Sequence, residues 1–175
     1  MRGAKGLTLV EMLVVVAVLA AGATLVAPAF RDLLRDTRRA AALTALSHAL
    51  QAARTTAASS GRSIRVCGTL DGRSCSGSTR WGPELLQRPA AGEAAALSRI
   101  VALPAGRGAP TVRANRAYID FAPLAPSATT ATITVCDDRG PPAARALIVS
   151  RTGRLRVSDR SASGEPLACP RESRP

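Results

Sequence analysis

The chain begins with a long apolar stretch. From Met12 to Phe30 there are 19 residues without a charge. As a helix this stretch reaches about 28 Å, close to the hydrocarbon thickness of a bilayer. We therefore expect residues 7–30 to form the transmembrane half of a helix.

A helical pattern continues beyond this stretch to about Ser59, and Gly61 is a natural stop. Residues 31–60 are expected to form an amphipathic half of the same helix, with two apolar faces. The face richest in leucine is predicted to pack on the protein's own sheet, and it comprises Leu43, Leu46, Leu50, Ala53 and Ala57. The opposite face is predicted to meet neighbouring helices, and it comprises Phe30, Leu33, Leu34, Thr37 and Ala41.

From residue 61 to residue 175 the pattern changes to short alternating segments separated by Gly and Pro, which is typical of strands and turns. The predicted fold class is α+β, with a long N-terminal helix packed on an antiparallel sheet. Seven strands are predicted, at Ser63–Thr69, Leu97–Leu103, Thr111–Ala114, Ala117–Phe121, Ala131–Asp137, Arg145–Ser150 and Arg154–Ser158.

Composition excludes several kinds of chemistry. Aromatic residues make up 2% of the chain, which nearly excludes a binding surface of stacked rings. His48 is the only histidine, so catalytic triads that need histidine and histidine-rich metal sites are excluded. His48 is interpreted as an exposed helix residue. With no nucleotide loop or metal cluster in the sequence, we expect no enzymatic activity, no cofactor and no metal.

The net charge of +12 comes from 24 basic and 12 acidic residues, and Lys5 is the only lysine. An arginine bias of this kind is explained by a GC-rich genome. It is also typical of proteins that bind polyanions such as nucleic acid or acidic lipid headgroups.

Four cysteines form an even set without a CxxC spacing, which favours disulfides outside the cytosol over zinc or thioredoxin-type chemistry. Cys67 and Cys75 bracket a turn-rich stretch that a short bridge can close. Cys136 and Cys169 would then pair and tie the C-terminal tail to a strand. Three connectivities are possible for four cysteines, and the spacing does not choose among them.

A carboxylate, Glu11, lies one turn into the apolar stretch, where it is costly in lipid. The alternative of a cleaved secretory signal gives Glu11 no role. Gly6, Leu7 and Glu11, followed by the apolar helix, resemble the leader and first turn of type IV pilins and pseudopilins. The resemblance implies that residues 1–6 are a leader, that a prepilin peptidase cuts between Gly6 and Leu7, and that the new amino end is N-methylated. Leu7 stands where the family usually has phenylalanine.

Cleavage would give Leu7 a free, charged amine. Glu11 can then pair with the amine of a neighbouring subunit, which offsets part of the cost of both charges in the bilayer and sets the register between helices. We therefore expect lateral assembly with other pilins in the inner membrane. The charges flanking the helix favour the opposite orientation, but the cysteines indicate that the large domain lies in the periplasm.

The segment from Val66 to Cys75, the run Arg80-Trp81-Gly82 and the late run from Ser150 to Arg156 resemble minor pseudopilins of the FimT/GspH type. In the FimT branch a Gly-Arg-x-Arg motif is associated with DNA binding in natural transformation. Gly153-Arg154-Leu155-Arg156 matches this motif. The resemblance implies that a thin filament captures external double-stranded DNA.

Residues 145–160 hold five arginines and one aspartate, a net charge of +4 in 16 residues. Strand alternation predicts that Leu155 and Val157 point inward and that Arg154 and Arg156 point outward. Gly153 permits a turn that brings Arg151 near them. The predicted DNA-binding residues are Arg151, Gly153, Arg154, Arg156 and Arg160, with contacts mainly to phosphates.

The alternative interpretation is that arginines on an exposed strand only keep it soluble and unpaired. The protein would then be a structural or priming minor pilin, or a pseudopilin of a type II secretion system, that does not bind DNA.

Overall fold

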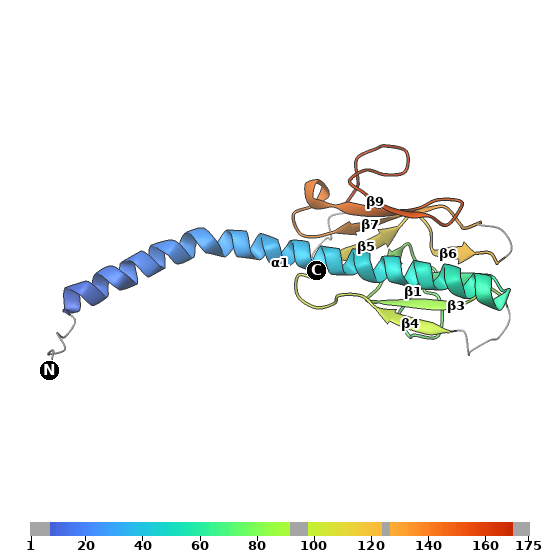
Figure 1. Cartoon of the computed structure of the whole chain (residues 1–175), viewed down its shortest axis with the longest axis horizontal. Coiled ribbons are helices and arrows are strands. Elements are labelled where there is room, and N and C mark those ends of the chain that lie inside the picture. The colour runs from blue at the N-terminus through green and yellow to red at the C-terminus, as the bar shows by residue number, and fades with distance from the viewer. Residues whose placement is uncertain (1–7, 92–97, 124–126, 170–175) are drawn as a thin grey trace. The chain divides into compact units, whose positions relative to one another are not determined.

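A computed structural model describes residues 8–91, 98–123 and 127–169 of the 175-residue chain (Figure 1). The described residues form one long helix, α1 (Leu9–Ser60), nine strands and a short 3-10 helix, η2 (Pro141–Ala143). The chain divides into two compact units, and the boundary falls within α1, between Asp36 and Thr37.

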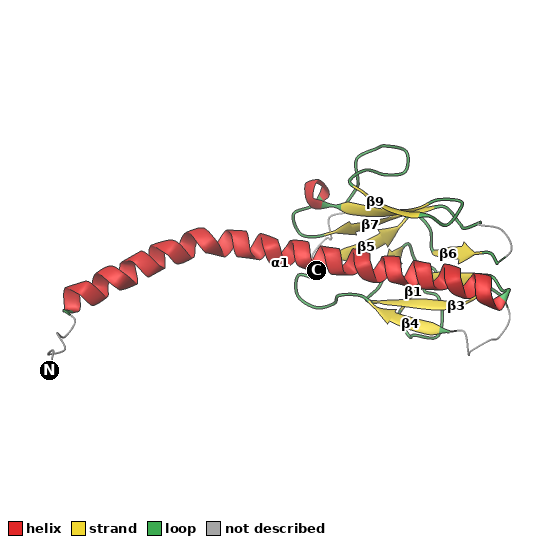
Figure 2. Ribbon diagram, viewed as in Figure 1, coloured by secondary structure: helices red, strands yellow, loops and turns green. Residues whose placement is uncertain are grey.

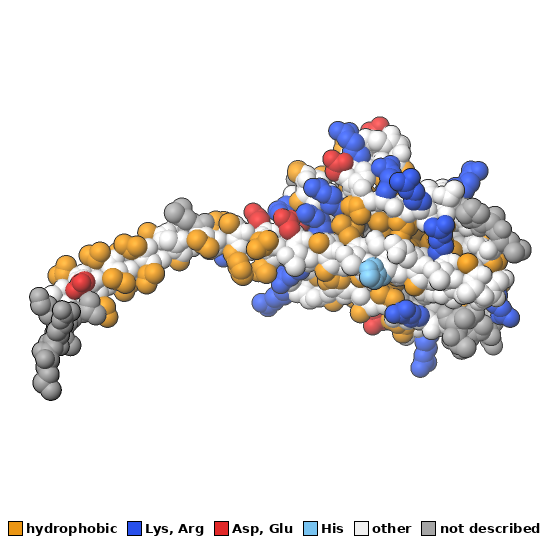
Figure 3. Space-filling model, viewed as in Figure 1, with side chains coloured by type: hydrophobic (Ala, Val, Ile, Leu, Met, Phe, Trp, Pro, Cys, Tyr) orange, Lys and Arg blue, Asp and Glu red, His pale blue; other side chains and the backbone are white. Residues whose placement is uncertain are grey.

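The first unit contains the N-terminal part of α1. The Thr8 hydroxyl accepts a hydrogen bond from the backbone N–H of Glu11 at 3.3 Å, which caps the first turn. Large apolar side chains of this part are exposed to solvent, from 76% for Leu9 to 41% for Leu34. Figure 3 shows them covering the helix surface. By length and composition, α1 is able to cross a membrane.

The second unit contains the remainder of α1, whose leucine-rich face is buried as predicted. Leu46 and Leu50 are fully buried, and Leu43 retains 9% exposure. Gly61 ends the helix with a φ of +67°, a left-handed conformation that glycine adopts without strain. His48 is exposed, as expected.

The strands form two antiparallel sheets, so the predicted α+β class is correct (Figure 2). The four-stranded sheet has the order β4 (Arg99–Ala102), β3 (Glu84–Pro89), β1 (Ile64–Thr69) and β6 (Tyr118–Phe121). The five-stranded sheet has the order β2 (Arg80–Trp81), β5 (Thr111–Ala114), β7 (Ala131–Cys136), β8 (Arg145–Val149) and β9 (Leu155–Ser158).

One main core joins the helix to both sheets. It packs Leu46 and Leu50 of α1 together with Ile64 of β1, Phe121 of β6 and Ile133 of β7. A second, smaller cluster contains Cys136, Ala144, Ala146, Ile148 and Leu167. Because residues alternate between the faces of a strand, β8 contributes Leu147 and Val149 to the main core and Ala146 and Ile148 to the smaller cluster.

Two strands were not predicted, and one of them, β3, is central to its sheet. Its sequence, Glu-Leu-Leu-Gln-Arg-Pro, is made of residues with little preference for strands. Gln87 is only 3% exposed, and its Nε2 donates to Thr56 Oγ1 of α1 at 3.3 Å. Pairing with β1 on one side and β4 on the other overrides the local preference. The start of the predicted strand at Leu97 lies outside the described residues.

Both disulfides are present, between Cys67 and Cys75 and between Cys136 and Cys169. The first closes a turn that the carboxylate of Asp71 also holds. This carboxylate accepts from the backbone N–H groups of Arg73 and Ser74 at 2.9 Å each, and these bonds lower the pKa of Asp71. The second ties the C-terminal segment to the end of β7.

Candidate functional site

The arginine-rich segment folds as a tight hairpin between β8 and β9. Val149 pairs with Leu155, and Ile148 pairs with Arg156. Gly153 N donates to Ser150 O at 2.9 Å and Ser150 N donates to Arg154 O at 3.0 Å, while the Ser150 hydroxyl accepts from Arg154 N at 3.1 Å. Gly153 has a φ of +73°, which closes the turn.

The hairpin presents its arginines to solvent. Arg151, Arg154 and Arg156 are all exposed and lie within one turn and the start of one strand. Arg160 is exposed too, but its Nη1 donates to Gly164 O at 3.1 Å, so it belongs to the next turn. The structure thus brings three of the four predicted arginines to the tip of the hairpin.

The predicted alternation of β9 is only partly correct. Leu155 is half-buried and packs against the main core, whereas Val157 is 56% exposed. Val157 pairs with Leu147, whose side chain lies in that core. It remains exposed because β9 is the edge strand of its sheet, where the core ends.

Arg54 of α1 lies beside the turn at Gly153. The sequence did not indicate this contact. A Cβ placed on Gly153 would lie 3.3 Å from Arg54 Cδ and 3.4 Å from Arg54 Nε. The same Cβ would lie 3.5 Å from the ring of Phe121. Gly153 is therefore buried within a surface turn, and the stem of Arg54 helps to cover it.

The segment before β7 also holds the backbone of the hairpin in place. Ala128 N donates to Arg151 O at 2.7 Å, and Ala128 forms a bridge with Phe121 of β6. The turn is therefore held by α1, β6 and the segment before β7. Its arginines project from a backbone that is already in place, so only their side chains need to be ordered when an anion binds.

Several arginines elsewhere are neutralised by carboxylates. Arg65 forms two hydrogen bonds of 2.8 Å with Asp120 and lies 3.7 Å from the centre of the Tyr118 ring. Its pKa is raised, mainly by the hydrogen bond with Asp120. Within the described part of the chain, no carboxylate forms an ion pair with Arg54, Arg151, Arg154 or Arg156.

Asp137 is the most buried of the paired carboxylates, with 4% of its side chain exposed. Its Oδ2 lies 2.7 Å from Arg139 Nη2 and 3.4 Å from Arg39 Nη1 of α1. Burial raises the pKa of Asp137, but hydrogen bonds from Arg139 and the charges of both arginines outweigh burial and lower it. Arg39 also donates to Ala143 O, which fastens α1 to the turn at η2.

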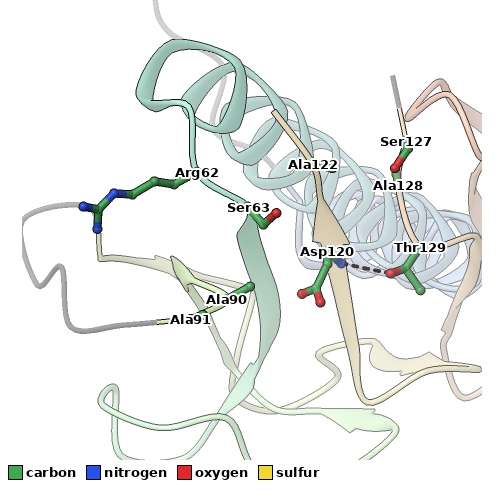
Figure 4. Close-up of a pocket in the computed structure, with 9 residues that line it drawn as sticks. All are labelled: Arg62, Ser63, Ala90, Ala91, Asp120, Ala122, Ser127, Ala128 and Thr129. Carbon is green, nitrogen blue, oxygen red and sulfur yellow. Dashed lines mark hydrogen bonds between the residues drawn. The ribbon is translucent and has the colours of Figure 1, made fainter. Parts of the chain in front are cut away.

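A pocket of about 640 Å³ lies next to the hairpin, and its lining includes Ala128, whose N–H donates to Arg151 O (Figure 4). Small side chains dominate its lining, including Ser63, Ser127 and Thr129. In Figure 4 the side chain of Arg62 extends away from Asp120, whose N–H donates to Thr129 Oγ1 at 3.3 Å. Arg65 already neutralises Asp120, and the other charged residue of the lining is Arg62.

The residues predicted for processing, Gly6 and Leu7, lie outside the described residues. Glu11 is in the first turn of α1, three residues after Thr8. This spacing matches a capping box, in which a glutamate at the third helical position follows a threonine cap. The backbone N–H of Glu11 therefore takes part in capping the helix, and the pairing role of its carboxylate remains a prediction.

Comparisons with known proteins give two family matches. The model described as "Type II transport protein GspH" matches residues 42–153. The model described as "Prokaryotic N-terminal methylation motif" matches residues 1–27. The first match ends at Gly153, so Arg154 and Arg156 lie beyond it. Among curated proteins, none matches the chain.

The fold is similar to that of the type IV minor pilin FimU of Pseudomonas aeruginosa strain PAO1. Its crystal structures in space groups P65 and P21 each give a TM-score of 0.54. Sequence identity is 24% and 25%, over 73% of this chain and 97% and 92% of the two FimU chains. This likeness, together with the described helix and sheets, indicates the type IV pilin fold.

Proposed function

Because the chain belongs to the GspH family of type II transport proteins, and is thus a minor type IV pilin or pseudopilin, we propose that it binds double-stranded DNA through its arginine hairpin. In this proposal a filament that contains the protein captures external DNA for uptake in natural transformation. Arg151, Arg154 and Arg156 contact phosphates, and Gly153 shapes the turn that presents them.

The observation that carries the proposal is the set of unpaired guanidinium groups on a fixed turn. Guanidinium groups match the geometry of phosphate oxygens and stay charged at every physiological pH. The carboxylates of Asp32, Asp120 and Asp137 form ion pairs with other arginines and not with those of the hairpin. Since the chain has few aromatic residues, base stacking contributes little, and binding is expected to be weakly selective for sequence.

The test is the salt dependence of DNA binding by the full chain in a non-ionic detergent. A 30-base-pair duplex is titrated at several salt concentrations, first with the natural protein and then with the Arg154→Gln/Arg156→Gln variant. Each lost phosphate contact lowers the slope of log affinity against log salt by about 0.9, so the double variant is expected to lose about 1.8.

Arg99→Gln on β4 is the matched control, because it removes one exposed arginine from the edge of the other sheet. The control is expected to leave the slope within experimental error of the natural protein. A natural protein that does not bind at low salt, or a double variant that binds unchanged, would show that the hairpin is not a DNA site. The alternative, a structural or priming minor pilin without DNA binding, would then be the better description.

The same proposal includes processing and location. A prepilin peptidase cuts between Gly6 and Leu7, the apolar half of α1 remains in the inner membrane, and the second unit lies in the periplasm. The two disulfides support this orientation, because disulfides persist in the periplasm and are rare in the cytosol. Mass analysis of the membrane-extracted protein tests the cut directly. A chain that still carries its first six residues would contradict it.

A further inference from the structure

We propose that Arg54 of α1 is a further phosphate-binding residue, so that the DNA surface runs from the hairpin tip onto the helix. This inference rests on the proposed function and adds a contact that the Gly-Arg-x-Arg motif does not contain. It starts from the close approach of the Arg54 stem to Gly153.

The geometry gives Gly153 a second role besides its positive φ. A Cβ at this position would press on Arg54 Cδ at 3.3 Å, closer than ordinary van der Waals contact. The missing side chain therefore lets the stem of Arg54 lie directly on the turn. The charged end of Arg54 is thereby kept beside the turn that separates Arg151 from Arg154.

The helix is rigid where Arg54 leaves it. Leu50 and Ala57, which lie within one turn of Arg54 on either side, are fully buried in the main core. Phe121 packs in the same core and also contacts the position of Gly153. Because helix and hairpin share these contacts, the backbone positions that carry Arg54 and the hairpin arginines are held in a fixed arrangement.

The charges around Arg54 also favour an anion. The sequence contains no acidic residue between Asp36 and Asp71, so the part of α1 from Thr37 to Ser60 carries no carboxylate that repels phosphate. In the hairpin, the only acidic residue from Arg145 to Arg160 is Asp159. Figure 3 shows basic side chains around the helix and strands of the second unit. A duplex that contacts the hairpin therefore meets no opposing charge on the helix beside it.

The test compares Arg54→Gln with Arg54→Lys in the same DNA titration of the full chain in detergent. Arg54→Gln is expected to lower the log–log slope by about 0.9, equivalent to about eightfold in affinity between 1 M and 0.1 M salt. Arg54→Lys keeps the charge and is expected to keep the slope. Unfolding midpoints equal to that of the natural protein verify that both variants are folded.

Arg99→Gln is again the matched control for the loss of one exposed arginine. If Arg54→Gln behaves like Arg99→Gln while Arg154→Gln/Arg156→Gln loses binding, the helix contact is refuted and the hairpin site stands. If the natural protein fails to bind DNA at low salt, the hairpin proposal and the helix contact are refuted together. The two failures are therefore distinguishable in one set of titrations.

Discussion

Gly153 combines two requirements that are usually met by separate residues. Its φ of +73° needs a residue without a Cβ, and the space beside it is occupied by the stem of Arg54. Gly61 provides a natural comparison, because its φ of +67° is similar but nothing lies within 4 Å of the position of a Cβ. Comparing substitutions at the two glycines therefore distinguishes the cost of backbone strain from the cost of a new side-chain contact.

We predict that Gly61→Ala and Gly153→Ala destabilise the fold similarly, by about 1–2 kcal/mol each, because both place an L-residue in the left-handed region. Arg54 is flexible enough to move away from the new methyl group, so the extra contact adds little to the loss. Urea unfolding measures both values. Only Gly153→Ala is expected to weaken DNA binding. A much larger loss for Gly153→Ala would mean that contact with Phe121, rather than φ, controls the turn.

Asp137 is a residue at which stability should depend on pH. Its pKa lies below the usual value because of Arg139 and Arg39, so the folded state binds the proton less readily than the unfolded chain. Stability from this pair is therefore fully present above the ordinary aspartate pKa of about 4 and is lost as pH falls below it.

We predict that Asp137→Asn lowers the free energy of unfolding at pH 7 by about 1–3 kcal/mol, because it leaves Arg39 and Arg139 without their buried carboxylate. The difference from the natural protein should shrink as pH falls below about 4. Unfolding midpoints measured across this range test both statements. Asp159→Asn, an exposed control, should change stability by less than about 0.5 kcal/mol. A difference that stays constant as pH falls well below about 4 would contradict the pairing.

Helix α1 shows how far periodicity can identify a packing face. Leu46, Leu50 and Ala53 recur at helical spacing, and all three are fully buried. Periodicity works here because one continuous stripe faces one core. On the opposite face Phe30 is 57% exposed and Leu34 is 41% exposed, and their contact with neighbouring helices remains a prediction.

Strand β3 shows where local pattern fails. Glu84–Pro89 has few residues that favour strands, yet it pairs on both sides and buries Leu85 and Leu86. A strand between two others gains its stability from partners that are distant along the chain, and a local window contains no record of them.

The two disulfides close loops of different length, and we predict that they contribute unequally. Replacing Cys136 and Cys169 with serine should cost about 4 kcal/mol, because this bridge spans 33 residues. Replacing Cys67 and Cys75 should cost about 2.5 kcal/mol, because this bridge spans eight residues. Denaturant unfolding of the two double variants compares them directly.

Packing should increase the difference between the stability losses of the two double variants. The longer bridge also holds Leu167 in the smaller hydrophobic cluster, whereas the hydrogen bonds of Asp71 hold the shorter loop without its bridge. A larger loss from the shorter loop would contradict this order.

In the assembled filament, Glu11 is expected to pair with the freed amine of Leu7 in a neighbouring subunit. Glu11→Gln separates this role from helix capping, because glutamine serves equally well in a capping box. An unpaired charge in the bilayer costs about 3 kcal/mol, so incorporation should fall on the order of a hundredfold. Quantifying the variant in purified filaments measures this effect.

Thr8→Ala is the matched control for Glu11→Gln, since it removes the cap and keeps the carboxylate. It is expected to be incorporated normally. Normal incorporation of Glu11→Gln, with or without a defect in Thr8→Ala, would contradict the pairing role.

Sequence alone was enough to establish the features that depend on neighbouring residues. The apolar run, the buried leucine face, the end of α1 at Gly61 and the alternation of strands and turns are encoded within windows of a few residues, so local periodicity and glycine reveal them. The leader motif is local in the same way, and it led to the family that the GspH match shows.

Folding in three dimensions was needed for every feature that joins distant parts of the chain. It selected the two cysteine pairs among three connectivities, inserted β3 between β1 and β4, and brought Arg39 to Asp137. It also laid Arg54 on Gly153, which no spacing along the chain indicates. Such contacts depend on how α1 packs against two sheets, and packing is a property of the whole core rather than of any segment within it.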